Sequence, residues 1–250
     1  MLTGLFTSAN AMDAFQTSLD NTSNNLANIN TTAFKRSTVN FQDLVYNGAQ
    51  NMQVGTGVKV GSVSPKGFTQ GAITPTGDEN NVAINGNGFL VVQVSDGTLR
   101  YTRDGSLHRD ATGRLVTDAG NILQPPITVP NNTLSTSIAA DGTVTVLTSS
   151  APTVPKIIGQ IQVATFPNQE GLTIEAGNLY AESAASGAPE PGTPGTSGRG
   201  QLKQYSLELS NVDLSTELTT MVTTQQAYAA NSKVVNTSAQ MLQSSMALIS

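Results

Sequence analysis

The first thirty residues carry apolar side chains at a helical spacing. Large apolar residues recur every seven positions, and further apolar residues follow three or four positions later. This pattern predicts a helix from about residue 3 to residue 28, with an apolar seam along one side. An asparagine-rich run at 24–30 lowers helix propensity and is expected to end it. The seam consists of Leu5, Met12, Leu19 and Leu26.

The last part of the chain repeats this pattern over a longer stretch. One line of positions is spaced by seven, and a second line lies four residues after each of its first five members. Asp213 is placed to cap this helix, and Glu217 adds negative charge to its first turn, where the helix dipole favours it. A seven-residue repeat sustained over about 36 residues predicts coiled-coil packing. The first line contains Leu214, Met221, Tyr228, Val235, Leu242 and Ile249, and the second contains Leu218, Gln225, Ser232, Ala239 and Met246.

Between about residue 55 and residue 180, apolar residues alternate with polar ones, as in β-strands. Asp-Gly pairs at 96–97, 104–105 and 141–142 stand between apolar runs and predict hairpin turns. Residues 186–200 are mostly Gly, Pro, Ser and Thr, which predicts a loop or an extended linker. The expected strands are 82–84, 89–94, 115–117, 127–129, 143–147 and 157–166.

These patterns predict an α+β fold. Long N- and C-terminal heptad helices form a coiled-coil pair, and between them lies a central all-β domain of antiparallel hairpins. A chain of 250 residues is long enough to bury such a core. The expected segments are an N-terminal helix at 1–30, an extended or hairpin connector at 31–66, a β-rich domain at 67–185, a Gly/Pro-rich return segment at 186–210 and a C-terminal helix at 211–250.

Charge is scarce along the whole chain. Charged residues make up 12%, about half of the roughly 25% in ordinary soluble proteins. Isolated coiled coils carry Glu and Lys beside their seams, whereas these helices present Ser, Thr, Gln, Asn and Ala. We therefore expect a self-assembling array in which each helix is surrounded by other helices. The alternatives are a monomer with a neutral surface and a single intramolecular coiled-coil hairpin.

Several classes of protein are disfavoured by the same totals. The net charge of −5 and the scattered basic residues argue against nucleic-acid binding. No stretch approaches the roughly 18 apolar residues of a membrane span, so direct membrane insertion is not expected. No Lys or Arg precedes Lys35, so we expect either a cytoplasmic protein or export without a cleaved signal. The chain has no cysteine, which excludes disulfides and thiolate metal sites.

The sequence shows no constellation of catalytic or metal-binding groups. The single histidine, His108, is interpreted as a surface residue in a turn, since one histidine alone forms neither a zinc site nor a catalytic pair. The Asn-Gly-Asn-Gly run at 85–88 lacks the third glycine of a nucleotide cradle, and the Asp-Gly pairs lack the spaced carboxylates of a calcium loop. Tyr228 is interpreted as a core residue of the helical seam. We therefore expect no catalytic, cofactor or metal site.

Segments at both ends and in the middle resemble a known family. The run SNNLANINTTAFK at 23–35 resembles the N-terminal signature of bacterial flagellar rod and hook proteins, and SNVDL at 210–214, with MV at 221–222 and 225–235, resembles their C-terminal signature. In the middle, YTRDGS at 101–106, QPPITVP at 124–130, and SGAP at 186–189 with PG at 194–195 are most similar to the distal rod protein of the basal body. The matching N-terminal motif residues are Ser23, Asn24, Asn25, Leu26, Ala27, Asn28, Asn30, Phe34 and Lys35.

The resemblance to this flagellar basal-body rod protein family implies a structural subunit of the distal rod. Such subunits polymerise into a hollow drive shaft that transmits torque from motor to hook, with the terminal helices as the inner tube and the β domain outside. The implied partners are copies of the chain, the proximal rod and hook proteins, and bushing-ring proteins. The implied location is the basal body in the cell envelope, reached through the flagellar secretion apparatus. We expect the two apolar seams to be the surface that packs between subunits.

The chain departs from the family pattern in places. Ala33 stands where the family usually has glycine, so we expect the backbone there to avoid positive φ. Gln226, Ala229 and Ala239 replace residues that are commonly charged, and the link between 46 and 55 is shorter than in distal rod proteins. The alternatives are another axial member, either the proximal rod or the hook protein, and, from a different class, a surface adhesin with a β domain on a coiled-coil stalk.

Overall fold

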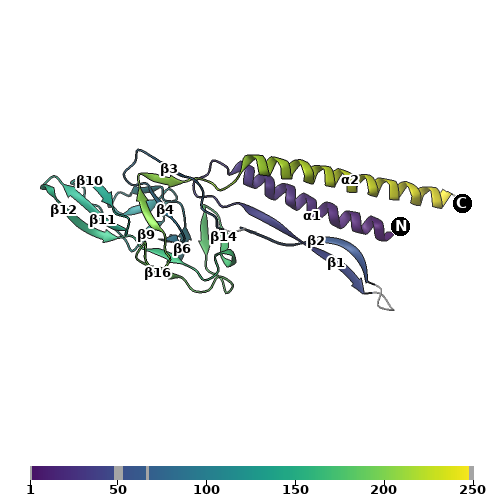
Figure 1. Cartoon of the computed structure of the whole chain (residues 1–250), viewed down its shortest axis with the longest axis horizontal. Helices are drawn as coiled ribbons and strands as arrows, with labels where there is room; N and C mark the ends of the chain where they lie inside the picture. Colours follow the sequence, from purple (N-terminus) through teal and green to yellow (C-terminus); the bar gives the residue numbers. More distant parts are fainter. Residues whose placement is uncertain (1, 48–52, 66–67, 248–250) are drawn as a thin grey trace. The chain divides into compact units, whose positions relative to one another are not determined.

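The computed structural model describes residues 2–47, 53–65 and 68–247. Contacts divide the chain into two compact units. The helical unit contains the described residues of 1–29, 36–66 and 212–250, and the β unit contains those of 30–35 and 67–211. The predicted N-terminal helix, central β-rich part with antiparallel strands and C-terminal helix are thereby confirmed (Figure 1).

In the helical unit, α1 (Leu2–Ala27) and α2 (Leu214–Ala247) lie side by side (Figure 1). α1 ends in the asparagine-rich run, as predicted, where the Asn28 side chain donates to the backbone oxygen of Asn24 at 3.0 Å. The same carbonyl also accepts the backbone N–H of Asn28 at 3.1 Å, so the asparagine side chain adds a second bond at the end of the helix.

α2 begins directly after its predicted cap. The Asp213 carboxylate accepts the backbone N–H of Thr216 at 2.7 Å, which satisfies one of the free donors of the first turn. The predicted N-cap is therefore confirmed. The seam residue Ile249 lies outside the described residues.

A long β-hairpin completes the helical unit. Strands β1 (Ser37–Asn47) and β2 (Gln53–Pro65) are antiparallel and contact α1. The rings of Phe15 on α1 and Phe41 on β1 meet edge to face, with centroids 6.1 Å apart. The short link between the two strands, residues 48–52, lies outside the described residues.

All strand pairs assigned in the β unit are antiparallel. The largest sheet has the order β14-β15-β6-β5-β9-β8-β7, and β13 joins β5 and β16 to it. A separate three-stranded sheet has the order β10-β11-β12, and two further pairs are β4 with β17 and β3 with β18. A single short 3-10 helix, η1 (Gln169–Gly171), is assigned in this unit.

The bounds of these strands are as follows. The first half contains β3 (Ile73–Pro75), β4 (Val82–Asn85), β5 (Phe89–Gln93), β6 (Leu99–Thr102), β7 (Leu107–Arg109), β8 (Leu115–Thr117), β9 (Ile122–Gln124) and β10 (Thr133–Ile138). The second half contains β11 (Thr143–Thr148), β12 (Ala151–Gln160), β13 (Val163–Thr165), β14 (Thr173–Glu175), β15 (Leu179–Ala181), β16 (Glu190–Gly192), β17 (Gln201–Gln204) and β18 (Ser206–Glu208).

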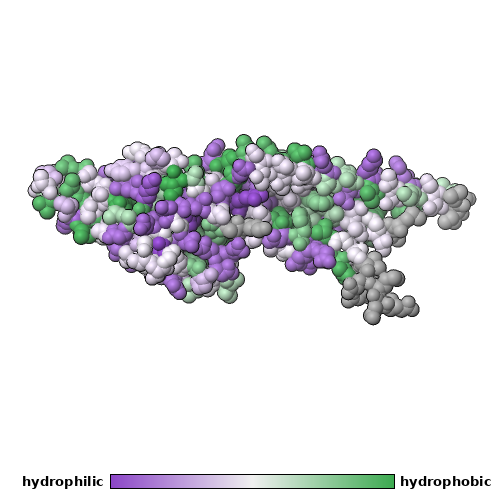
Figure 2. Space-filling view, viewed as in Figure 1, coloured by the Kyte–Doolittle hydropathy of each residue, from purple (hydrophilic) through white to green (hydrophobic). Residues whose placement is uncertain are grey.

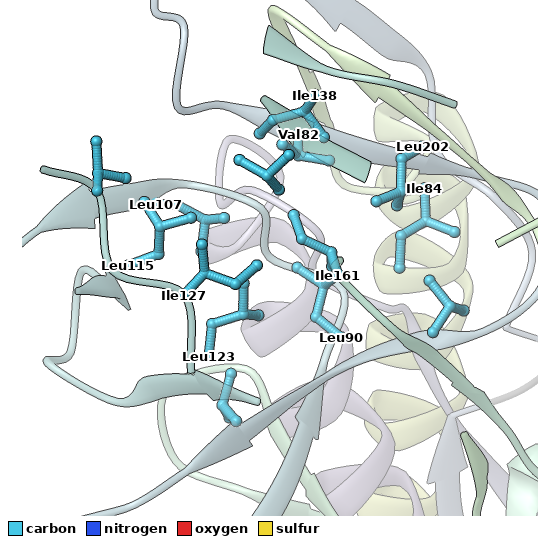
Figure 3. Close-up of a cluster of buried hydrophobic side chains, with 14 of the residues drawn as sticks. Val82, Ile84, Leu90, Leu107, Leu115, Leu123, Ile127, Ile138, Ile161 and Leu202 are labelled. Carbon is cyan, nitrogen blue, oxygen red and sulfur yellow. The ribbon is translucent and has the colours of Figure 1, made fainter. Parts of the chain in front are cut away.

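The β unit has two buried clusters. The larger one is aliphatic and joins strands of different sheets, so that Leu90 of β5 and Ile138 of β10 share a core with the β4–β17 pair (Figure 3). The second is aromatic: Phe89 meets Phe166 and Tyr180 edge to face, with centroids 5.9 and 5.5 Å apart. Each fully buried large side chain contributes about 1.5–3 kcal/mol, so this unit holds a substantial core of its own.

Two of the expected strands are wrong. At 127–129 only Thr128 makes an isolated bridge, although Ile127 and Val129 are buried. Prolines on both sides of this segment remove the backbone donors that a ladder needs. The stretch 157–166 divides into β12 and β13, because the N–H of Ile161 turns to the carbonyl of Gly142 at 2.8 Å.

One of the three expected hairpins is also wrong. The pairs at 96–97 and 141–142 do connect neighbouring strands, and Gly97 and Gly142 have positive φ. The pair at 104–105 separates β6 and β7, which are not neighbours in the sheet. A Cβ on Gly105 would lie 1.5 Å from the carbonyl oxygen of Val82, so this glycine permits a close backbone approach. His108 lies on β7 and not in a turn.

Candidate assembly surface

The face that α2 turns toward α1 is polar. α2 makes its main contacts within the helical unit with α1. The most buried positions of α2, Glu217 and Thr224, begin a line spaced by seven that polar side chains occupy. Apart from Ala14, the buried positions of α1 are polar as well. On α2 this line contains the buried Glu217 and Thr224 and the half-buried Asn231, Ser238 and Ser245; on α1 the buried polar residues are Ser8, Ser18, Thr22 and Asn25.

The apolar lines of α2 lie beside this polar line. With 3.6 residues per turn, the line through Met221 lies roughly 50° around the helix from it, and the line through Leu218 roughly 100°. Met221, Tyr228, Val235 and Leu242 are therefore half-buried. Leu214, Leu218 and Met246 are 47%, 44% and 73% exposed. On α1, the seam residues Leu5, Met12, Leu19 and Leu26 are half-buried.

A buried polar network closes one end of the helix pair. The Asn25 side chain donates to the carbonyl of Ser37 at 2.8 Å and to the Glu217 carboxylate at 3.3 Å, and it accepts the Ser37 N–H at 3.0 Å. Arg36 forms an ion pair with Glu217, which is 1% exposed. The first residue of β1 is thus tied to both helices, and Glu217 serves as a buried anchor in addition to its place in the first turn.

A second buried ionic group lies in the β unit. The ammonium of Lys35 pairs with the Glu208 carboxylate and donates to the carbonyl of Thr69 at 2.9 Å. The guanidinium of Arg103 donates to the same carboxylate at 2.9 Å and to the carbonyl of Gly86 at 2.8 Å. Lys35, Arg103 and Glu208 are 3%, 1% and 1% exposed. We call these three residues the ion triad.

The surroundings of the ion triad shift the ionisation of nearby groups. Burial lowers the pKa of Lys35, and the neighbouring Glu208 carboxylate partly opposes this shift. Burial also raises the pKa of the Tyr180 hydroxyl above its ordinary value. Elsewhere in the β unit, burial raises the pKa of Asp104, although the carboxylate accepts the N–H of Ser106 at 3.1 Å. The unit therefore holds charges where water does not screen them.

The backbone at residues 33 and 34 differs from the prediction. Ala33 has φ of +56°, so the expectation that it avoids positive φ is wrong. Its N–H donates to the carbonyl of Glu208 at 2.8 Å, and the N–H of Asn211 donates to the carbonyl of Phe34 at 3.3 Å. These tertiary bonds and the burial of Ala33 hold a conformation that costs an alanine about 1 kcal/mol.

The other motif residues fall into three groups. Asn25 and Lys35 are buried and bonded as described. Asn28 bonds back to Asn24, and Asn30 is exposed. Ser23, Asn24 and Ala27 are exposed, whereas Leu26 and Phe34 are half-buried.

Sequence reasoning missed the acidic partners of the basic motif residues. Glu208 was given no role, Arg36 was not considered, and Glu217 was read only as a helix-dipole charge. In a chain with so few charges, an acidic residue within or beside an apolar segment is itself a signal for a buried pair. The pairing could not be inferred, because the paired residues lie far apart in the chain. Lys35 and Glu208 are 173 positions apart, and Arg36 and Glu217 are 181 positions apart.

Groups for other chemistry are sparse in the part of the chain that the structure describes. His108 pairs with Asp118, and both side chains are more than half exposed. Within residues 2–47, 53–65 and 68–247, no cluster of three or more His, Asp or Glu side chains is arranged to hold a metal. Neither described helix combines the length and the apolar character needed to cross a membrane.

Comparison with known proteins gives matches at both ends and in the middle of the chain. Residues 5–35 match the flagella basal body rod protein model, residues 83–146 match the D1 domain of the flagellar hook protein FlgE/F/G, and residues 203–248 match the C-terminal part of the flagellar basal body rod FlgEFG proteins.

Whole-chain relatives are flagellar rod proteins. The flagellar basal-body rod protein FlgG of Buchnera aphidicola subsp. Schizaphis graminum is 42% identical over 97% of this chain and 98% of its own length. FlgG of Caulobacter vibrioides is 40% identical over 98% of both chains. The flagellar hook protein FlgE of Helicobacter mustelae is 37% identical, but over 50% of this chain and 30% of its own length. The chain therefore belongs to the FlgG family of flagellar basal-body rod proteins, the distal rod proteins that its motifs resemble.

Proposed function

We propose that this structural rod subunit polymerises through apolar residues that its own helix pair leaves uncovered. The observation that carries the proposal is the division of the helical unit into a polar inner face and an exposed apolar surface. The exposed apolar residues of α1 and α2 are Phe6, Leu214, Leu218, Val222, Val234, Met241 and Met246.

These residues are too many for an ordinary monomer surface. Single exposed apolar residues are normal, but contiguous apolar surface generally marks an interaction site. Figure 2 shows hydrophobic residues at the surface along α2. Burial against other helices would contribute about 1.5–3 kcal/mol for each large side chain that becomes fully covered.

In the proposed rod, the exposed apolar residues of each subunit pack against other copies of the same chain. In this arrangement the half-buried seam residues have two roles. They contact the other helix of their own chain on one side and a neighbouring subunit on the other. The helices then line a hollow rod, and the β unit lies outside them. Torque passes through helix-to-helix contacts, and the remaining partners are the proximal rod, the hook and bushing-ring proteins.

The proposal also covers the route to the assembly site. We propose that the chain reaches the basal body in the cell envelope through the flagellar secretion apparatus without a cleaved signal. Membership in the flagellar rod family supports this location, because a rod subunit has to reach the basal body.

The test places a charge in the exposed apolar line. Met246→Asp should leave the chain folded, because Met246 is 73% exposed, and should block polymerisation, because burying an unpaired carboxylate costs several kcal/mol. Leu242→Asp should block it as well. Gln240→Asp is the matched control on the same helix, where an exposed polar residue is replaced. Rods would be counted in purified basal bodies. Normal rods built from Met246→Asp subunits would contradict the proposal.

A further inference from the structure

The longest strand of the β unit lies at a free sheet edge. β12 has 10 residues, and β11 is its only strand partner among the described residues. A long strand with unpaired N–H and C=O groups is a template for pairing with another chain. The other assigned strands of this unit have six residues or fewer.

Exposed apolar side chains increase the tendency of this edge to pair with another chain. Val154 and Ile157 on β12 are 64% and 67% exposed, and Leu134 on β10 of the same sheet is 63% exposed. The sheet contains one charged residue within its strands, Lys156. Figure 2 shows hydrophobic residues at the surface of the end of the β unit that carries this sheet in Figure 1. A segment of six or seven residues with high β propensity, low net charge and no proline is the signature of strand-mediated aggregation, so the prolines are what sets this strand apart.

The same edge carries two features that oppose pairing. Pro152 and Pro155 lack the N–H groups that an added strand would need as donors. The register is also broken there: while β11 advances two residues from Val146 to Thr148, its antiparallel partner β12 goes back five residues from Lys156 to Ala151. The strand therefore bulges between these points, and a bulge turns an edge away from regular pairing.

The opposite edge of this sheet is covered in another way. Backbone donors of β10 are used by side chains of the same unit: the N–H of Thr136 donates to Glu79 and that of Ile138 donates to Gln204, each at 3.0 Å. Farther along β12, Ile158 packs against the aliphatic cluster and Gly159 lies against Ile127. The accessible edge is therefore the segment 152–157.

We propose that the proline-containing bulge of β12 blocks strand addition by a second copy of this chain at the 152–157 edge. This inference rests on the proposed association through the helices, which would bring copies of the chain together at high local concentration. Association through a sheet edge would compete with the helical contacts and would not lead to the same assembly. The two prolines exclude this second mode at the free edge of β12.

The test restores the missing donors in the full chain. In Pro152→Thr/Pro155→Thr, threonine matches the hydroxyl-rich strands beside it and has high β propensity. The double variant should associate at a concentration about tenfold lower than the unchanged chain, since two backbone hydrogen bonds become available. Association would be followed by light scattering. Hydrogen exchange should show new protection of the amides at 152–157 in the associated form.

Controls separate edge pairing from other effects. Pro191→Thr alters an exposed proline on β16, whose three residues are too few to template a strand, and should change nothing. Adding Val154→Lys to the double variant should restore the original behaviour, because a charge on an edge opposes pairing. If the double variant loses protection in β4 and β5, Pro155→Thr alone replaces it. Equal association with unchanged exchange at 152–157, or new protection in α1 and α2 alone, would overturn the proposal.

Discussion

The helical unit and the β unit differ in the kind of side chain that they bury. In the β unit, two clusters of large apolar side chains fill the interior, and the ion triad is fully paired within it. In the helical unit, the buried residues of α1 and α2 are Ser, Thr, Asn and Glu apart from Ala14, while several Leu, Val and Met side chains are exposed. From this difference we expect the β unit to be stable by its own core, and the helical unit to gain much of its stabilisation from neighbours in the proposed rod.

The local sequence of α2 supports this contrast. Its first half is rich in threonine, a weak helix former, and the hydroxyls of Thr219, Thr220 and Thr224 donate to carbonyls one turn earlier. Such bonds compete with the helical pattern and slightly destabilise an isolated helix. Long helices in proteins owe most of their stability to packing rather than to propensity.

The largest expected effect is a difference in local stability between the two units. In dilute solution, amides of α1 and α2 should exchange about a thousandfold faster than those of β4 and β5, because local opening ranges from almost no cost up to the full free energy of unfolding. Hydrogen exchange read by NMR would measure this, together with sharp, poorly dispersed signals from residues 1–28. Slow exchange in both helices of the monomer would break the comparison, since the helix pair would then be stable alone.

The second effect concerns the ion triad of the β unit. Glu208→Gln keeps the shape of the side chain but leaves Lys35 and Arg103 buried without their counter-charge, which should lower the free energy of unfolding by about 3–5 kcal/mol. Urea unfolding of the full chain, followed by a probe in the β unit, would measure the loss. Arg100→Gln removes a partly exposed pair with Glu175 and should cost about 0–1 kcal/mol. If both variants lost the same free energy of unfolding, burial would not determine how much an ion pair contributes to stability.

The smallest effect is a pH dependence within the β unit. Burial raises the pKa of Asp104 above its value in the unfolded chain. Below the unfolded pKa the carboxyl is neutral in both states. Between the unfolded and the folded pKa, the unfolded chain has released this proton and the folded chain retains it, so stability falls as pH rises until the folded carboxyl has also ionised. Asp104→Asn lacks this penalty, so the variant should gain stability relative to the unchanged chain between pH 4 and pH 7. Thermal unfolding at both values would measure the gain, and a difference independent of pH would contradict it.

Much of the secondary structure could be predicted from local patterns. The seven-residue spacing gave both helices, and Asp213 marked the start of α2 because its cap depends only on residues next to it in the chain. The strands at 82–84, 89–94, 115–117 and 143–147 followed from alternation with turn residues beside them. The errors arose where local signals met distant partners: Gly105 accommodates Val82, and Ala33 adopts positive φ against Glu208.

What the sequence alone determined was therefore the set of elements and, through its motifs, membership in the flagellar rod family. What only the tertiary structure decided was which face of each helix is covered and which charges are paired. A heptad records that a helix has an apolar side, but the side that meets its partner depends on how both helices are anchored at Asn25, Arg36 and Glu217. Buried ion pairs such as Lys35 with Glu208 are decided in the same way. Desolvation penalises a buried charge, and the fold offsets this penalty only where it brings in a partner from far along the chain.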